Sequence, residues 1–108
     1  MSAVSGATIG FAVYRHGETP GTLDAVWSYE NTWGGPGQAT GGPQDGFAGR
    51  YHIRYYFEDG TFSDEYDLVI EQSGTYYEAS WLVDGELQAV GLGVELDGAL
   101  AIGWRRLE

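Results

Sequence analysis

Residues 51–70, YHIRYYFEDGTFSDEYDLVI, carry the pattern that decides the fold of this chain. Apolar and polar side chains alternate on both sides of Asp59-Gly60, and an Asp-Gly pair between two alternating runs is the strongest short-range signal of a β-hairpin. A two-residue turn there places apolar residues opposite apolar ones and basic residues opposite acidic ones, as cross-strand packing prefers. The expected pairs are Phe57 with Phe62, Ile53 with Tyr66, Tyr51 with Leu68, Arg54 with Glu65, and His52 with Asp67. We therefore expect an antiparallel hairpin with one face turned inward.

The alternation continues into the C-terminal half, where Ser73-Gly74 and Asp84-Gly85 separate further apolar runs. Two-residue turns at both positions would extend the hairpin into an antiparallel meander whose apolar residues share one face. The expected pairs are Ile70 with Tyr77, Leu68 with Ala79, Tyr66 with Trp81, Ala79 with Val90, and Tyr77 with Leu92.

The turn at Asp97-Gly98 is expected to be longer than the others. A two-residue turn there would point the large apolar residues of the last strand away from the inner face. One additional residue, with Gly98 in the left-handed region forming a bulge, places Val94 opposite Ile102 and restores the inward face.

The pattern predicts seven strands, at about 7–15, 22–30, 48–58, 61–72, 75–83, 86–96 and 100–107. Between the second and third lies the glycine-rich segment NTWGGPGQATGG, residues 31–42. If the first strand pairs antiparallel with the last, the strands at 22–30 and 48–58 run in the same direction, so an antiparallel sheet needs a strand between them. We therefore expect an eighth strand within 36–42. Eight such strands would close an all-β, antiparallel, up-and-down barrel that has no sheet edges.

The composition narrows the possible functions. The chain has 108 residues, with 16 acidic and five basic side chains, all of these arginine, and a formal net charge of −11. We expect a single domain over 1–108, no binding to nucleic acid and no attachment to an anionic membrane. The lack of lysine and of cysteine argues against a phosphate-binding loop in the glycine-rich segment and against thiolate chemistry. The two histidines are expected on different faces, so neither a metal nor a cofactor is expected. The start of the chain lacks the pattern of a signal peptide, which favours a cytoplasmic protein.

An eight-stranded antiparallel barrel of this size resembles the calycin-like small β-barrels of lipocalin and avidin type, and also the cofactor-free cyclase barrels of natural-product pathways. The resemblance covers residues 7–107 and is one of architecture, because Gly10-Phe11-Ala12 stands where a lipocalin carries Gly-x-Trp. It implies a calycin-like fold with a ligand inside the barrel, and it assigns no site residue.

The inward positions are rich in aromatic residues, which suits a flat or polyunsaturated ligand. At the end of the barrel that carries Asp64, here called the upper rim, the expected pairing brings Gln88 opposite Trp81 and Arg106 opposite Val90. These polar groups could orient a ligand, and an Asp64–Arg106 ion pair could polarise a carbonyl. Alternatively, the rings fill the barrel and the rim residues are solvated strand ends. The candidate ligand-binding residues are Trp27, Tyr29, Trp33, Tyr55, Tyr66, Trp81, Gln88, Trp104 and Arg106.

Three functions remain open at this stage. The first is a non-enzymatic binder of a small apolar or aromatic molecule. The second is a cofactor-free cyclase or isomerase that acts on a flexible apolar substrate, with Asp64, Tyr55 and Arg106 as catalytic residues. The third is a structural module that forms a homo-oligomer through a smooth outer patch. The small residues expected to form that patch are Gly10, Ala12, Gly91, Gly93, Ala101 and Gly103.

Overall fold

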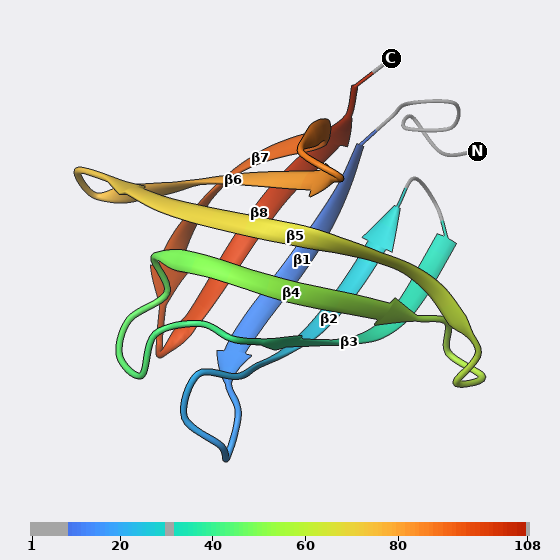
Figure 1. The fold of residues 1–108 in the computed structure, drawn as a ribbon, viewed down its shortest axis with the longest axis horizontal. Helices are drawn as coiled ribbons and strands as arrows, with labels where there is room; N and C mark the ends of the chain where they lie inside the picture. The colour runs from blue at the N-terminus through green and yellow to red at the C-terminus, as the bar shows by residue number, and fades with distance from the viewer. Residues whose placement is uncertain (1–8, 30–31, 108) are drawn as a thin grey trace.

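The computed structural model describes residues 9–29 and 32–107, and these form eight antiparallel strands that close into one barrel (Figure 1). Each strand pairs with the next along the chain, and the first pairs with the last. The all-β, up-and-down barrel predicted from the sequence is confirmed. The described residues contain no helix, and hence none long and apolar enough to cross a membrane. The strands are β1 (Ile9–His16), β2 (Leu23–Tyr29), β3 (Thr32–Thr40), β4 (Gly49–Tyr56), β5 (Phe62–Ser73), β6 (Tyr76–Val83), β7 (Glu86–Leu96) and β8 (Ala99–Arg106).

The glycine-rich segment forms β3, which pairs with β2 on one side and with β4 on the other. The predicted eighth strand is therefore confirmed, and it is longer than expected. Its glycines allow the wall to approach large rings inside the barrel. A Cβ atom at Gly34 would overlap the indole of Trp27, and one at Gly37 would lie 2.8 Å from the ring of Tyr55. Glycine at these positions leaves room for aromatic side chains in a narrow barrel.

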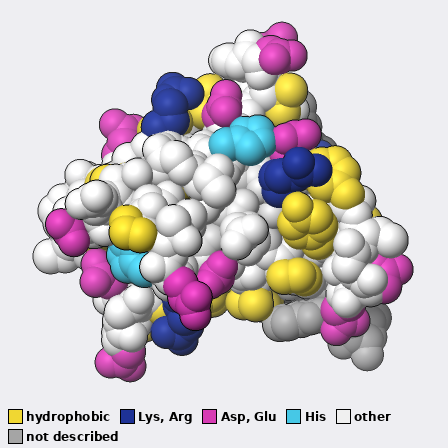
Figure 2. Space-filling view, turned by 60° about the horizontal axis from the view of Figure 1, so that its bottom comes forward, with side chains coloured by type: hydrophobic (Ala, Val, Ile, Leu, Met, Phe, Trp, Pro, Cys, Tyr) yellow, Lys and Arg dark blue, Asp and Glu magenta, His cyan; other side chains and the backbone are white. Residues whose placement is uncertain are grey.

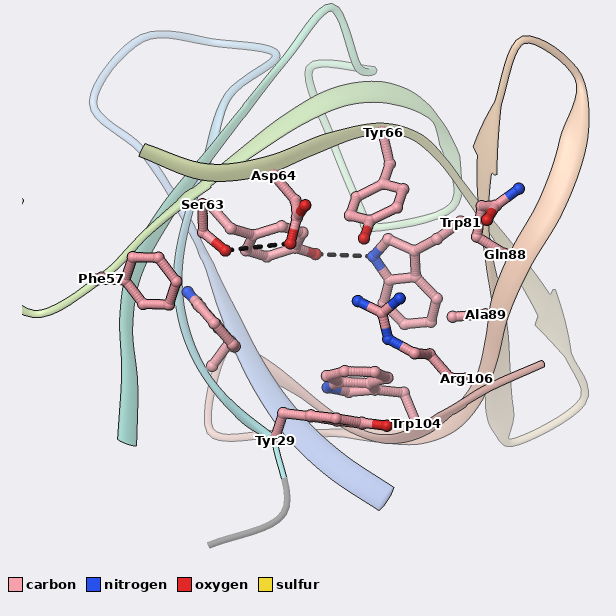
Figure 3. Close-up of a pocket in the computed structure, with 12 residues that line it drawn as sticks. Tyr29, Phe57, Ser63, Asp64, Tyr66, Trp81, Gln88, Ala89, Trp104 and Arg106 are labelled. Atoms are coloured by element: carbon pink, nitrogen blue, oxygen red, sulfur yellow. Dashed lines mark hydrogen bonds between the residues drawn. The ribbon is translucent and has the colours of Figure 1, made fainter. Parts of the chain in front are cut away.

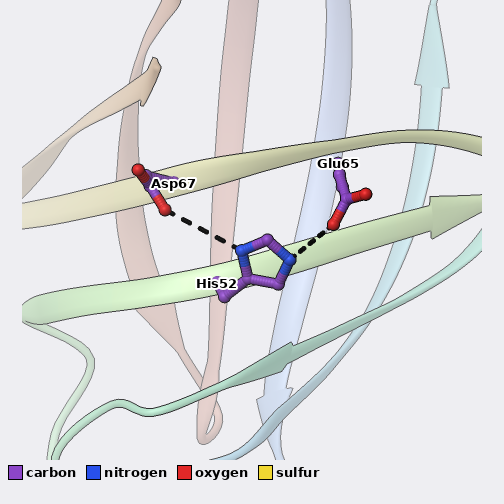
Figure 4. A network of polar contacts seen from close by, with 3 residues as sticks. All are labelled: His52, Glu65 and Asp67. Atoms are coloured by element: carbon purple, nitrogen blue, oxygen red, sulfur yellow. Dashed lines mark hydrogen bonds and ion pairs between the residues drawn. The ribbon is translucent and has the colours of Figure 1, made fainter. Parts of the chain in front are cut away.

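The β4–β5 hairpin has the predicted register over most of its length, with Ile53 opposite Tyr66. Close to the turn a register shift places Tyr56, rather than Phe57, opposite Phe62. On the outer face, His52 Nε2 lies 2.6 Å from Glu65 Oε2, and its Nδ1 lies 3.8 Å from Asp67 Oδ1 (Figure 4). Both contacts are about half exposed, and such surface pairs contribute less than about 1 kcal/mol. His52 is thus a surface residue of the sheet, as expected.

The β5–β6 turn is displaced from its predicted position by one residue. Ser73 pairs with Tyr76 across a turn that begins at Gly74, whose φ is 66°. Ile70 consequently lies opposite Ala79, so the predicted pairing of Ile70 with Tyr77 is wrong. The register error is two residues, and an even shift leaves every side chain on its predicted face.

The β6–β7 hairpin contains an irregularity that the sequence analysis missed. Asp84-Gly85 forms the expected turn, but the register shifts between Trp81 and Leu82, and Trp81 pairs with Ala89. Gln88 is the extra residue of a β-bulge. Each later residue of β7 therefore faces the side of the sheet opposite to the predicted one. The predicted pairs of Ala79 with Val90 and of Tyr77 with Leu92 are therefore wrong. The observed partners of Ala79 and Tyr77 are Gly91 and Gly93.

The bulge also explains why the longer turn predicted at Asp97-Gly98 is wrong. Leu96 pairs with Ala99 across a two-residue turn in which Asp97 and Gly98 have φ angles of 51° and 79°. Positive φ at both central residues is the geometry of a type I′ turn. A register shift of one residue between β6 and β8 is needed to keep the large residues of β8 on the inner face. The chain places that shift at Gln88 instead of Gly98.

The predicted smooth outer patch is also wrong, because four of its six residues point inward. Ala12 is 1 % exposed, and a Cβ atom at Gly10 would lie 2.7 Å from the indole of Trp104. On the inside of the barrel, small residues of β1 and β7 face large residues of β8, so the two sizes complement each other. The outer face over β7, β8, β1 and β2 instead carries exposed large side chains. These are Ile9, Phe11, Val26, Leu92, Val94 and Leu96.

The end of the barrel opposite the upper rim is closed by Phe47, from the loop between β3 and β4. Phe47 is 2 % exposed; its ring stacks on His16 at a centroid distance of 4.5 Å and meets Tyr77 edge-on at 6.5 Å. The hydroxyl of Tyr51 donates a 2.9 Å hydrogen bond to the carbonyl oxygen of Phe47. This plug leaves the upper rim as the end at which a ligand could enter.

Candidate functional site

A pocket of about 250 Å³ opens at the upper rim, between the ends of the strands (Figure 3). Eight of the nine candidate ligand-binding residues line it, and so does Asp64. The ninth candidate, Trp33, belongs to β3, and its side chain lies outside what the structure describes. The full lining is Trp27, Tyr29, Tyr55, Phe57, Ser63, Asp64, Tyr66, Trp81, Gln88, Ala89, Trp104 and Arg106.

The walls of the pocket are aromatic rings held in fixed orientations. Tyr29 and Trp104 stack with their centroids 4.9 Å apart and their planes at 13°, and Trp81 lies 6.0 Å from Trp104. Across the pocket, Trp27 meets Tyr55 edge-on at 5.8 Å, and its Nε1 donates a 3.1 Å hydrogen bond to the carbonyl oxygen of Tyr56. These contacts hold flat apolar surfaces around the pocket.

The floor of the pocket is a buried polar trio of Tyr14, Tyr55 and Trp81. Trp81 Nε1 donates a 2.7 Å hydrogen bond to the hydroxyl of Tyr55, and the Tyr55 and Tyr14 hydroxyl oxygens lie 2.6 Å apart (Figure 3, dashed line from Trp81). Burial raises the pKa of both tyrosines, so both phenols keep their protons at neutral pH. Tyr55 was expected near the rim as a catalytic residue. It lies deeper than that and is 7 % exposed.

The rim carries a carboxylate and a guanidinium that do not pair with each other. Asp64 lies opposite Tyr55, as predicted, and accepts a 3.1 Å hydrogen bond from Ser63 Oγ. Arg106 lies opposite Ala89, so its predicted pairing with Val90 is wrong. Within residues 9–29 and 32–107 the ion pairs are those of His52, so the expected Asp64–Arg106 ion pair does not form.

The guanidinium of Arg106 is instead held against aromatic rings. Its central carbon lies 5.6 Å from the centroid of Tyr29, a cation–π contact. Burial raises the pKa of Tyr66 and the nearby Asp64 adds to this, while Arg106 opposes the rise. Arg106 therefore points into the mouth of the pocket, where Figure 3 shows it between Trp81 and Trp104.

Gln88 lines the pocket for a reason different from the predicted one. It was expected to lie opposite Trp81, but Ala89 occupies that position and Gln88 is the bulged residue. Its Nε2 donates a 3.2 Å hydrogen bond to the carbonyl oxygen of Glu86. Sequence reasoning missed Ala89 because the bulge exchanges the faces of β7, and it missed Ser63 because simple alternation placed that residue outside.

A second, shallower groove crosses the outer face above β8. Its floor is opened by Gly103, at which a Cβ atom would meet nothing within 4 Å. Leu92 and Ile9 form its apolar sides, and Arg105 and Glu78 lie at its borders. This groove shares Trp104 with the pocket at the upper rim, and Ser80 is the one hydroxyl-bearing side chain of its lining.

The acidic side chains are dispersed rather than gathered into a binding cluster. Figure 2 shows them spread over one face of the molecule, among a few arginine and histidine side chains. In the described part of the chain, no three histidine, aspartate or glutamate residues come together in a way that could hold a metal ion.

A comparison with protein families, curated proteins and solved structures found no match to this chain. The closed eight-stranded barrel is compatible with a calycin-like fold.

Proposed function

We propose that this protein binds a small, planar, largely apolar molecule in the pocket at the upper rim. The observation that carries this proposal is the asymmetry of the barrel. One end holds an aromatic-lined pocket of about 250 Å³, whereas Phe47 fills the other end. This volume lies just below the range of about 300–1,000 Å³ that is typical of sites for drug-sized ligands. A molecule with a single ring or with two fused rings suits the space.

The ring arrangement supports a flat ligand. A planar molecule entering the mouth would lie between the stacked Tyr29–Trp104 pair and the rings of Trp27 and Phe57, all of which line the pocket. Burial of its apolar surface would contribute about 25 cal/mol per Å², and ring–ring contacts would add to this.

Titration with 2-ethylnaphthalene, followed by tryptophan fluorescence, tests this proposal, because three tryptophans line the pocket. Two alanine-to-leucine variants provide a matched pair. Ala89→Leu adds side-chain volume inside the pocket, whereas Ala101 lies between Val13 and Val94 on the outer face. Ala89→Leu should weaken binding at least about tenfold, and Ala101→Leu should leave it unchanged. Binding that resists both substitutions, or no binding by the wild-type protein, would refute the proposal.

The geometry supports a binder better than a cyclase. The catalytic hypothesis requires Asp64, Tyr55 and Arg106, which all line the pocket, to polarise one substrate together. Tyr55 is buried in the floor, whereas Asp64 and Arg106 lie at the rim without an ion pair between them.

Self-association is a second candidate function, favoured by the exposed outer face over β7, β8, β1 and β2. Leu92 and Leu96 are 60 % and 61 % exposed there, and exposed apolar patches often mark sites of protein association. Light scattering over a range of concentrations should reveal a homo-oligomer that Leu92→Asp dissociates. A monomer at every concentration would exclude this role.

A further inference from the structure

The polar trio in the pocket floor contains one more hydrogen-bond donor than it can use. Its donors are the indole N–H of Trp81 and the hydroxyls of Tyr14 and Tyr55, and its acceptors are the two phenolic oxygens. The structure gives the trio two hydrogen bonds, one from Trp81 to Tyr55 and one between the tyrosines. Each bond uses one proton, so one phenolic proton is left over. Because burial raises the pKa of both phenols, neither group loses its proton at ordinary pH.

The position of the two tyrosines determines where the spare proton can be used. Tyr55 belongs to the lining of the pocket, whereas Tyr14 lies behind it, fully buried. If Tyr55 donates to Tyr14, the proton of Tyr14 is left with no partner in the trio. If Tyr14 donates to Tyr55, the Tyr55 proton is available to the pocket. Only the second arrangement can be completed by a ligand.

The rest of the pocket contributes one further group that can only donate hydrogen bonds. Arg106 brings a guanidinium, which can only donate, and it forms no ion pair among the described residues. Asp64 is the one carboxylate of the lining, and its Oδ2 accepts a hydrogen bond from Ser63. A ligand with an oxygen acceptor would therefore suit both the spare proton of the trio and Arg106.

We propose that the ligand is a planar conjugated carbonyl compound whose oxygen enters first and accepts a hydrogen bond from the Tyr55 hydroxyl. This inference rests on the proposed binding function and specifies the ligand class of the same site. The Tyr14 hydroxyl then donates to Tyr55, and every donor of the trio is satisfied.

The test compares 2-acetylnaphthalene with 2-ethylnaphthalene, two probes of nearly the same shape that differ by the carbonyl oxygen. The wild-type protein should bind the ketone about tenfold more tightly, the ratio expected for one hydrogen bond to a buried donor. Tyr55→Phe should abolish this preference. Tyr14→Phe should preserve it, because Tyr55 keeps both its proton and its bond from Trp81. Tyr66→Phe is the control for a hydroxyl that lines the pocket outside the trio, and it too should preserve the preference.

The outcomes separate the two proposals. If both probes bind with equal affinity, the inference is wrong and the binding function stands. If neither probe binds, the binding function fails and the inference with it. If Tyr55→Phe does not fold, a second measurement takes the place of that variant: the ¹³C chemical shift of the carbonyl carbon of labelled 2-acetylnaphthalene bound to the wild-type protein. A downfield shift on binding that persists in Tyr14→Phe supports Tyr55 as donor; no shift overturns the proposal.

Discussion

The hydroxyl of Tyr51 donates a 2.9 Å hydrogen bond to the carbonyl oxygen of Phe47, and the bond is buried. It fixes the loop between β3 and β4 across the lower end of the barrel, with the Phe47 ring inserted among His16 and Tyr77. The barrel is therefore closed at its lower end and open at the upper rim. The proposed ligand site lies at the opposite end, where the pocket opens.

Removing the plug should destabilise the protein. Phe47→Ala should lower the free energy of unfolding by about 3 kcal/mol, because it deletes a buried ring that the closed barrel cannot replace. Phe62→Ala is the matched control, since Phe62 is 46 % exposed, and it should cost less than about 1 kcal/mol. Urea denaturation measures both changes. Equal effects would mean that Phe47 does not close the barrel.

The reversed face of β7 can be tested with two glycines. A Cβ atom at Gly91 would lie 2.7 Å from Ile102 and 2.8 Å from the carbonyl oxygen of Gly103, whereas a Cβ atom at Gly103 would meet nothing within 4 Å. Gly91→Ala should therefore destabilise the barrel by about 1–3 kcal/mol, and Gly103→Ala should be neutral. Thermal unfolding of the two variants provides the comparison. If Gly103→Ala were the harmful change, the assignment of inner and outer faces on β7 and β8 would be wrong.

Turn chemistry and alternation were enough to predict eight antiparallel strands, barrel closure and the inward faces of β2, β4, β5, β6 and β8. They also placed most of the candidate residues on the correct end. β3 was predictable because an antiparallel barrel closes only with an even number of strands, whatever the local propensity of each segment. That constraint made up for the weak strand signal of Gly34, Gly35 and Gly37.

The failures have three physical causes. Alternation identifies which residues share a face, but not which of two faces is inside. On β7 and on the upper half of β1 the larger residues are outside, because Gly10, Ala12, Gly91 and Gly93 must fit against Trp104 and Ile102. The bulge at Gln88 had no signal in the local sequence. The sequence does show that one register shift of a single residue is needed between β6 and β8, but either Gln88 or Gly98 could supply it. Phe47 was missed because a loop residue takes part in no alternation.

Alkaline pH should destabilise the protein. Burial raises the pKa of Tyr14 and Tyr55 in the folded state, so the unfolded chain loses these protons first as pH rises past about 10. The unfolded state then binds fewer protons than the folded state, and the free energy of unfolding decreases with pH. The stabilisation is complete below pH 10 and is lost above it. Urea denaturation at about pH 9 and about pH 11 should show the fall, and Tyr14→Phe should reduce it. The same fall in Tyr14→Phe would contradict the burial of that phenol.

Arg106 should select the charge of the ligand without supporting the fold. Arg106→Ala should leave the melting temperature nearly unchanged, because the side chain is exposed at the rim. It should weaken binding of 2-naphthoate by about tenfold or more, the loss expected for a charge-assisted hydrogen bond, and affect 2-ethylnaphthalene much less. Asp64→Asn should instead improve binding of the carboxylate, since it removes a negative charge from the same mouth. Equal losses for both probes in Arg106→Ala would mean that the arginine acts only by packing.

The most direct test is the location of a bound probe by nuclear Overhauser effects in solution. With 2-acetylnaphthalene bound, cross-peaks should join its ring protons to the Ala89 methyl group and to the indole of Trp81, both of which line the pocket and not the outer groove. The control signals are the side chains of Ile9 and Leu92, which line the outer groove. Contacts to Ala89 and Trp81 without contacts to Ile9 and Leu92 are the result that the account predicts. Contacts to Ile9 and Leu92 alone would contradict a ligand site inside the barrel.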